Sequence, residues 1–167
     1  KDILNPRISN KLIMNISFVI PVYKEEDNIL SLIEKINHNC NKSEINYKIF
    51  LIDDSPTQII KNKTKTFDNN LIYIYRGKKL GRGSAVLYGI EEALKTKFTD
   101  IIVEMDGDLS HNPDELENKI KKFNETQCDT LIASRYRGGS KIINWPISRK
   151  ILSFVSNKLA KFFLRIP

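Results

Sequence analysis

No stretch of this sequence is apolar over the roughly 18 residues that a membrane-spanning helix requires. Cysteine is scarce as well: Cys40 and Cys128 are the only two, and their separation fits neither a zinc motif nor a C-x-x-C redox pair. The first residues, from Lys1 to Arg7, lack the apolar core of a signal peptide. We therefore expect a cytoplasmic protein with two reduced thiols and no transmembrane helix.

Acidic residues are missing from the C-terminal part of the chain. Residues 133–167 hold eight of the lysines and arginines and no Asp or Glu, whereas residues 1–132 hold 19 basic and 20 acidic residues. The formal net charge of +7 is therefore a property of the C-terminal segment alone. A protein that binds nucleic acid over a broad surface is basic throughout, so this distribution indicates a local anionic partner instead.

Short β-branched and aromatic runs alternate with helical patterns along the chain. The runs predict strands at 16–20, where Pro21 should end the strand, and at 47–52, 71–75, 101–105 and 130–133. Helices are expected after an Asp27 N-cap, over 85–94, after an Asn112 N-cap and over 147–167, with 61–70 a mobile surface segment. This alternation predicts a three-layer α/β fold with a mainly parallel, Rossmann-like sheet.

The polar signals fall where the predicted strands end. Tyr23 and Glu25 follow the first strand, Asp53 and Asp54 the second, and the segment 81–83 the third. Asp106 and Asp108 follow the fourth strand, and Arg135 the fifth. Parallel sheets place ligands at the carboxyl ends of their strands, so we expect one binding site at this rim.

Each of these signals has a chemical interpretation and a simpler one. The carboxylates of Asp106 and Asp108 suit Mg²⁺ or Mn²⁺ with room for phosphate oxygens, or they form a solvated acidic turn. Asp53 and Asp54 would accept hydrogen bonds from a ribose or a base, or they start an Asp-Ser-Pro turn. The Gly-Arg-Gly-Ser segment 81–84 would cradle a phosphate through backbone N–H groups, or it is a basic surface loop.

Three other classes of protein fit parts of this pattern. A nucleotidyltransferase places its phosphate loop after the first strand, whereas Gly81 and Gly83 follow the third. A phosphohydrolase with a nucleophilic Asp carries its D-x-D motif on the first strand, whereas this motif ends the fourth. A nucleic-acid-binding module would use the basic C-terminal segment but leaves the rim carboxylates unexplained.

Five short motifs follow one another along the chain: PVYKE (21–25), IDD (52–54), RGKKLGRGSA (76–85), MDGDLSHNP (105–113) and SRY (134–136). In this order they resemble the motifs of family-two glycosyltransferases of the GT-A fold, and the resemblance covers residues 15–167. A further set of residues follows, namely Gly138-Gly139, Asn144-Trp145-Pro146 and Arg149 to Ser153 with Asn157. Through this set the chain is similar, within the family, to the dolichyl-phosphate (polyprenyl-phosphate) mannose synthases.

The resemblance implies a role for each matched residue. Nucleotide-sugar contacts would come from Pro21, Tyr23, Glu25, Ile52, Asp53, Asp54, Asp106, Gly107 and Asp108. Asp106 and Asp108, with Ser110, would hold Mg²⁺ or Mn²⁺, and Arg135 would join the two aspartates in catalysis. Arg135, Arg149 and Ser153 would bind the acceptor phosphate. The sequence departs from the family at Lys24 (usually Asn), Arg82 (typically Leu) and Gly107 (more often Ala), and the turn after Asp54 is one residue shorter.

The implied reaction moves mannose from GDP-mannose to a polyprenyl phosphate with inversion at the anomeric carbon. A related transferase using UDP-glucose or another nucleotide sugar is the alternative. The acceptor phosphate is largely dianionic at pH 7 and needs positioning more than a general base.

The resemblance also implies domain boundaries. We expect an N-terminal extension (1–15), a nucleotide-sugar-binding and catalytic domain (16–146) and a basic amphipathic helix (147–167), in a chain shortened at its C-terminus. The helix carries an apolar stripe and would lie peripherally at the cytoplasmic face of a membrane, with a separate membrane-anchoring protein as a further partner and no nucleic acid. The stripe comprises Ile147, Ile151, Phe154, Val155, Leu159, Phe162 and Phe163.

Overall fold

The computed structural model describes residues 14–67, 69–134 and 146–164. It divides the chain into two compact units, residues 1–126 (unit 1) and 127–167 (unit 2). The division falls at Thr126 rather than at the boundary near 146 that the sequence suggested, and the functional boundaries stay predictions. The expected extension 1–15 lies almost wholly outside the described residues.

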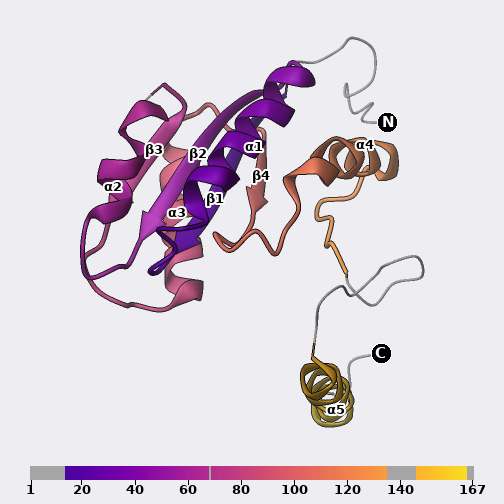
Figure 1. Cartoon of the computed structure of the whole chain (residues 1–167). Coiled ribbons are helices and arrows are strands. Elements are labelled where there is room, and N and C mark those ends of the chain that lie inside the picture. The colour runs from indigo at the N-terminus through magenta and orange to yellow at the C-terminus, as the bar shows by residue number, and fades with distance from the viewer. Residues whose placement is uncertain (1–13, 68, 135–145, 165–167) are drawn as a thin grey trace. The chain divides into compact units, whose positions relative to one another are not determined.

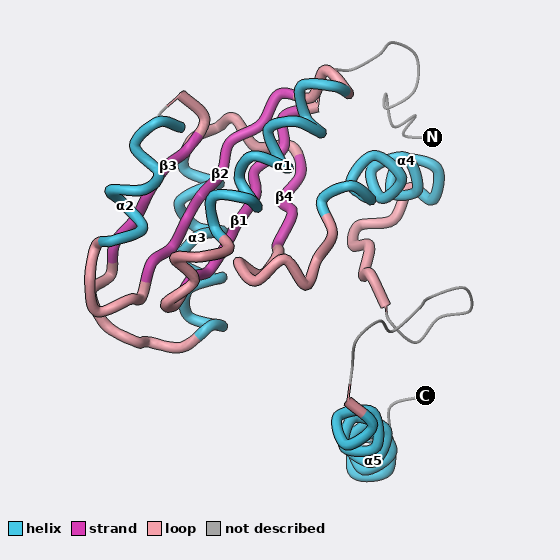
Figure 2. Tube along the Cα trace, in the orientation of Figure 1, coloured by secondary structure: helices cyan, strands magenta, loops and turns pink. Residues whose placement is uncertain are grey.

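Unit 1 contains a sheet of four parallel strands in the order β3-β2-β1-β4 (Figures 1 and 2). These strands are β1 (Asn15–Val22), β2 (Asn46–Asp53), β3 (Leu71–Tyr75) and β4 (Ile101–Glu104). The helical elements are α1 (Ile29–Lys42), α2 (Ile59–Thr64), η1 (Lys65–Phe67), α3 (Arg82–Lys95), η2 (Pro113–Glu115) and α4 (Leu116–Thr126). The parallel α/β prediction is confirmed.

Helices cover both faces of the sheet, which gives the expected three layers (Figure 1). Alternate residues of a strand point to opposite faces. In β1, Phe18 and Ile20 pack toward α1 and α2, whereas Val19 packs toward α3. The α1 side is the larger core and buries the apolar stripe of that helix completely, through Ile29, Leu32, Ile33 and Ile36.

Pro21 does not end β1, contrary to the expectation from sequence, because the missing proline N–H lies on the β4 side of the strand, beyond the last residue paired with β4. The carbonyl of Val22 accepts a hydrogen bond from Asp54 in the direction of β2, and that of Val19 accepts one from Met105 after β4. Residue 21 shares the β4 side with Val19, but the β4 ladder ends at Val19. A proline there removes no ladder hydrogen bond.

Three further expectations need correction. The helix α1 is capped by Asn28, one residue after the expected Asp27. The polar segment 61–70 is not irregular throughout, since α2 and η1 occupy most of it and Ile60 and Thr64 bury one face of α2. Residues 130–133 form no strand within the part of the chain that the structure describes, and Ile132 is 81% exposed. A strand exists only where another strand satisfies its backbone groups.

Unit 2 contains the helix α5 (Ile147–Leu164). Its apolar residues are exposed, with Phe162 at 77% and Phe163 at 74%. Within the parts of the chain that the structure describes, α5 and the other helices are too short or too polar to cross a bilayer.

Candidate functional site

A concave region of about 350 Å³ lies at the carboxyl edge of the sheet and is called the rim cleft below. The ends of all four strands of unit 1 contribute to it, so the signals that follow these strands converge as expected from the sequence, with the exception of Asp53. The lining residues are Pro21, Val22, Tyr23 and Glu25 after β1, Asp54 after β2, Lys79, Gly81, Arg82 and Ala85 after β3, and Asp106, Gly107 and Asp108 after β4.

The turn after β4 presents two carboxylates on a tightly held backbone. The backbone N–H of Asp106 donates to His111 Nδ1 at 3.2 Å, and that of Ser110 donates to Asp108 Oδ1 at 2.9 Å. Leu109 takes a left-handed φ of 61° inside this turn. Burial raises the pKa of the Asp108 carboxyl, but the hydrogen bonds from Ser110 outweigh this effect and leave the pKa below its usual value. Asp108 is therefore ionised at neutral pH.

Gly107 separates the two aspartates and lies against β1. A Cβ on this residue would come within 2.9 Å of Val22 Cγ1, closer than real Cβ atoms approach a neighbour. Val22 is itself 3% exposed and is held in the larger core. The packing around Val22 thus accounts for glycine at a position where the family more often has alanine.

Asp54 lies in the rim cleft but is engaged by protein partners. Arg76 donates two hydrogen bonds to this carboxylate, from Nε to Oδ1 at 2.6 Å and from Nη2 to Oδ2 at 2.7 Å. The backbone N–H of Leu80 also donates to Oδ2, at 3.0 Å. The Asp54 and Arg76 side chains are only 5% and 8% exposed. Asp54 therefore ties the end of β2 to the loop that carries Lys79 and Gly81. The sequence analysis did not predict the pairing of Asp54 with Arg76. A signal was present, because Arg76 directly follows a strand, as the other site residues do.

Asp53 and Ile52 do not line the rim cleft. Asp53 is fully buried, where its Oδ1 accepts from the Ser55 N–H at 2.8 Å and its Oδ2 from the Tyr73 hydroxyl at 2.6 Å. Ile52 is fully buried on the α3 side of the sheet. Their geometry supports a role in shaping the turn after β2 rather than in touching a ligand.

Basic groups lie in and beside the rim cleft as well. Lys79 Nζ lies 4.5 Å and Lys24 Nζ 5.5 Å from the centre of the Tyr23 ring. Gly81 adopts a φ of 94°, a conformation that side chains rarely take, and caps α3. The start of a 14-residue helix and Lys79 therefore line the same cleft as the carboxylates.

Arg82 joins these basic groups to the acidic turn. Its Nε donates to Asp106 Oδ1 at 2.7 Å, and another guanidinium nitrogen pairs with Glu104 at the end of β4. Neither contact was foreseen from the sequence, in which Arg82 only departs from the Leu typical of the family.

The carboxylates of Asp106 and Asp108 are the donors that the turn offers to a divalent cation. Among the described residues, no cluster of three or more His, Cys, Asp or Glu side chains could enclose a metal ion. Two carboxylates on one open turn nevertheless match the way in which Mg²⁺ is commonly held, by one or two carboxylates together with substrate phosphates and water. The residues fit an ion shared with a diphosphate, and they do not fit a structural metal site.

The acceptor residues lie elsewhere in the chain. Arg135 is outside the described residues, as is the side chain of Arg149. Ser153 is on α5 in unit 2. Their predicted contact with the acceptor phosphate stays a prediction.

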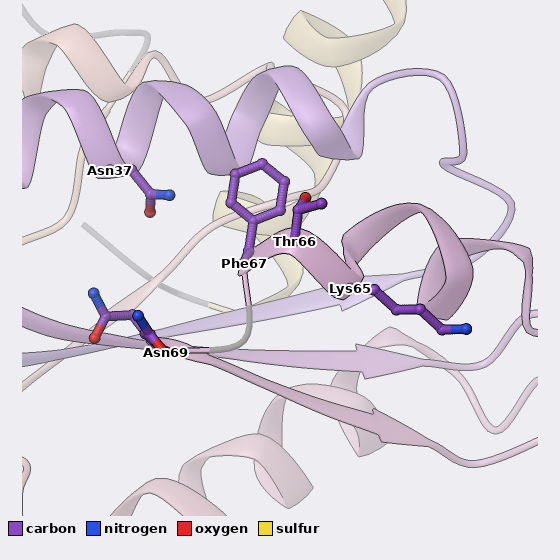
Figure 3. Close-up of a pocket in the computed structure, with 6 residues that line it drawn as sticks. Asn37, Lys65, Thr66, Phe67 and Asn69 are labelled. Carbon is purple, nitrogen blue, oxygen red and sulfur yellow. The ribbon is translucent and has the colours of Figure 1, made fainter.

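A second concave region, of about 300 Å³, is formed by α1, η1 and the start of β3. Figure 3 shows Asn37, Phe67 and Asn69 among its lining side chains. Asn37 Oδ1 accepts a hydrogen bond from Tyr47 at 2.8 Å, so this side chain serves the fold. The described residues that line this region are amides, a threonine, a lysine and a phenylalanine, and none of them is a carboxylate suited to metal or acid–base chemistry.

Comparison with known protein families identifies the origin of this arrangement. The family model described as glycosyl transferase family 2 matches residues 17–166. The chain belongs to glycosyl transferase family 2. The resemblance stated from the five motifs is thereby confirmed.

Two curated members of the family show similarity over most of this chain. A polyprenol monophosphomannose synthase of Mycolicibacterium smegmatis is 30% identical over 151 residues, 89% of this chain and 55% of its own length. A dolichol-phosphate mannosyltransferase of Pyrococcus furiosus is 33% identical over 142 residues, 84% of this chain and 38% of its own length. The chain therefore spans about half of one relative's length and less of the other's.

Solved structures support the fold. The crystal structure of residues 1–349 of S. aureus TarS matches 77% of this chain and 39% of that protein, with a TM-score of 0.55 and 20% sequence identity. The same protein in complex with UDP matches with a TM-score of 0.52 and 21% identity. At this identity the likeness establishes a shared GT-A-type α/β fold.

Proposed function

We propose that this chain forms the nucleotide-sugar-binding part of a glycosyltransferase that moves mannose from GDP-mannose to a polyprenyl phosphate, with inversion. One observation carries the proposal: the ends of β2 and β4 bring Asp54, Asp106 and Asp108 into one cleft, whose lining also holds Lys79 and the start of α3. A nucleoside diphosphate needs this combination of hydrogen-bond acceptors and positive charge. The names of the two curated relatives support mannose and a polyprenyl phosphate as the transferred sugar and the acceptor.

Each wall of the rim cleft has a task in this proposal. Pro21, Tyr23 and Glu25 would hold the nucleoside, with Asp54 positioned beside them by Arg76. Asp106 and Asp108, with Ser110 as a further ligand, would hold Mg²⁺ or Mn²⁺ against the diphosphate. A bound divalent cation supplies positive charge where negative charge grows on the leaving diphosphate. Lys79 and the α3 N-terminus would hold the same phosphates from the other side.

The acceptor would come to this cleft from the membrane. Its phosphate carries two negative charges near pH 7, so Arg135, Arg149 and Ser153 would position it for attack without a general base. The guanidinium fork suits phosphate oxygens and would keep one of them directed at the anomeric carbon. The exposed apolar residues and the four basic residues of α5 suit peripheral contact with an anionic bilayer, where the lipid is dissolved.

Calorimetric titration tests the donor half of the proposal. We expect GDP-mannose to bind more tightly in the presence of Mn²⁺ than in its absence, and more tightly than UDP-glucose. Asp108→Ala should remove the Mn²⁺ enhancement, whereas Glu117→Ala, which deletes an exposed carboxylate on α4, should leave it intact. UDP-glucose as the tighter ligand would support the alternative transferase. Failure of both nucleotide sugars to bind, or an intact Mn²⁺ effect in Asp108→Ala, would refute the proposal.

A further inference from the structure

The first carboxylate of the D-x-D turn is already paired with a cation that belongs to the protein. Arg82 is the first residue of α3, and its guanidinium bridges Asp106 and Glu104. Glu104 ends β4, two residues before Asp106, so the two acceptors and the arginine form one small network at the entrance of the rim cleft.

This network interferes with a metal ion at Asp106. A guanidinium and a divalent cation on the same carboxylate repel each other, whichever of the two oxygens the metal ion takes. Arg82 must therefore turn away before the ion binds with full strength. It is free to do so, because its side chain is 55% exposed and exposed ion pairs are weak.

A diphosphate in the rim cleft offers Arg82 a new partner. Gly81, Arg82 and Lys79 line the same cleft as the two aspartates, so phosphate groups held beside the turn lie within the reach of this side chain. The guanidinium fork matches phosphate oxygens at least as well as a carboxylate. Glu104 remains beside Arg82 in either position and keeps it at the entrance of the cleft.

We propose that Arg82 is a counter-ion that is exchanged between the protein and the substrate, and that it couples metal binding to nucleotide binding. Without nucleotide it neutralises Asp106 and weakens the binding of divalent cations. With a nucleoside diphosphate bound, it moves to the phosphates and leaves Asp106 to the metal ion. This inference rests on the proposed function, since it takes Asp106 as a metal ligand and a nucleoside diphosphate as the substrate part.

The coupling has a measurable consequence. Binding free energies are linked, so GDP must strengthen Mn²⁺ binding by the same factor by which Mn²⁺ strengthens GDP binding. One part of this enhancement comes from direct contact between the metal ion and the phosphates, and it should persist in a variant without Arg82. The other part comes from the release of Arg82 from Asp106, and it should be lost when residue 82 carries no charge.

The test is a Mn²⁺ titration by calorimetry and water-proton relaxation, on the free protein and on protein saturated with GDP or UDP. Arg82→Leu should bind Mn²⁺ without nucleotide about three- to tenfold more tightly than the unaltered protein, the range expected for removing an exposed ion pair and its repulsion. The enhancement of Mn²⁺ binding by GDP should shrink by a similar factor. Arg82→Lys keeps the charge and should stay close to the unaltered protein.

Lys78→Leu is the matched control, because it removes one positive charge from the exposed loop that precedes Arg82 and α3. Its Mn²⁺ affinity and nucleotide enhancement should stay unchanged, and circular dichroism should show that all variants are folded. Equal Mn²⁺ affinities of Arg82→Leu and the unaltered protein, or an equal effect in Lys78→Leu, would overturn the role of Arg82 and leave the proposed function standing. Absence of both Mn²⁺ and nucleotide binding in every variant would overturn both.

Discussion

Asp53 and Asp54 are neighbours in the chain, yet their side chains serve different purposes. Asp54 faces the rim cleft and pairs with Arg76, whereas Asp53 is buried and receives the Tyr73 hydroxyl. The sequence assigned both to the nucleotide because both follow a strand. It could not separate them, since consecutive residues at the end of a strand point to opposite sides and only the fold shows which side is closed.

The buried partner of Asp53 leads to a prediction about stability. Tyr73→Phe deletes a hydrogen bond to a buried carboxylate and should lower the free energy of unfolding by about 1–3 kcal/mol, measured by urea denaturation. Tyr75→Phe is the matched control, since its hydroxyl donates at 3.2 Å to the exposed carbonyl of Pro56, and it should cost less than about 0.5 kcal/mol. Equal losses in the two variants would contradict the role given to Asp53.

The unaltered protein and Tyr73→Phe should also differ in how their stability depends on pH. Burial, with the nearby Asp53 adding to it, raises the pKa of Tyr73 well above its ordinary value of 10.0. Above pH 10 the unfolded chain can ionise this tyrosine and the folded chain cannot, so the stabilisation is complete below pH 10 and falls as the pH rises. The stability difference between the unaltered protein and Tyr73→Phe should therefore narrow between pH 9 and pH 11. A constant difference across this range would show that Tyr73 ionises equally in both states.

Lys24, which departs from the family pattern, has a strained backbone conformation. It adopts a left-handed φ of 60°, and its N–H donates to Ser55 Oγ at 3.0 Å. Asparagine, the usual residue of the family here, tolerates this conformation better than lysine. We expect Lys24→Asn to raise the free energy of unfolding by about 0.5–1 kcal/mol in thermal or urea denaturation. Lys42→Asn, in the last turn of α1, makes the same exchange at a helical φ and should give no gain.

Among the elements, the strands with a hydrophobic signature and a neighbour were predictable. The patterns located all four strands of the described sheet to within two residues, and β3 at its observed ends. The segment 130–133 carries the same signature but forms no ladder with the other described residues, because propensity alone does not supply a partner. The helix α2 was missed because only Ile60 and Thr64, four residues apart, show its buried face within a polar stretch.

The contact between α3 and the sheet depends on one glycine. A Cβ on Gly89 would lie 2.5 Å from Val19 Cγ1 and 3.0 Å from Ile52 Cγ1, so the helix approaches the sheet more closely than alanine permits. Gly89→Ala should lower the free energy of unfolding by about 1–3 kcal/mol, less the roughly 1 kcal/mol that alanine gains as a helix former. Because α3 also positions Arg82 and Gly81 at the rim cleft, Gly89→Ala should lower the affinity for nucleotide as well.

Gly83→Ala in the same helix is the control, since a Cβ there meets nothing within 4 Å. It should be neutral or slightly stabilising. Val19→Ala added to Gly89→Ala should recover part of the loss, because it removes the methyl group that the new Cβ would strike. Gly89→Ala as stable as Gly83→Ala in urea denaturation would show that α3 can move outward at no cost.

Across the whole molecule, the distribution of charge and the position of the site were readable from the sequence. The first four motifs contain the residues that line the rim cleft at the ends of the four strands. The Arg82 network was not readable, because it joins a helix start to a strand end 24 residues away through side-chain geometry alone. The residues proposed for the acceptor, Arg135, Arg149 and Ser153, belong to the basic C-terminal segment, so this segment needs a test of its own.

The basic, apolar helix α5 makes the last prediction. Its exposed residues include Phe154, Val155 and Phe162, and Lys158 lies 5.0 Å over the ring of Phe154. Apolar side chains that enter the lipid interface next to lysines at the headgroups should bind anionic vesicles, with each lysine contributing about 1 kcal/mol near the surface. Replacing Lys158 and Lys161 by Glu should therefore reduce co-sedimentation with phosphatidylserine-containing vesicles at least tenfold.

The exchange Lys121→Glu plus Lys122→Glu on α4 is the matched control for this experiment. It changes the net charge of the protein by the same amount, on a helix of unit 1 that carries no such exposed apolar stripe among its described residues. If attraction to the vesicles depended only on overall charge, both double variants would lose binding equally, and the interfacial role of α5 would be refuted. If α5 is the contact, the α4 variant should keep most of its binding to the vesicles. Salt at 0.5 M should weaken the binding of the unaltered protein but not abolish it, because the apolar part of the interaction is not screened.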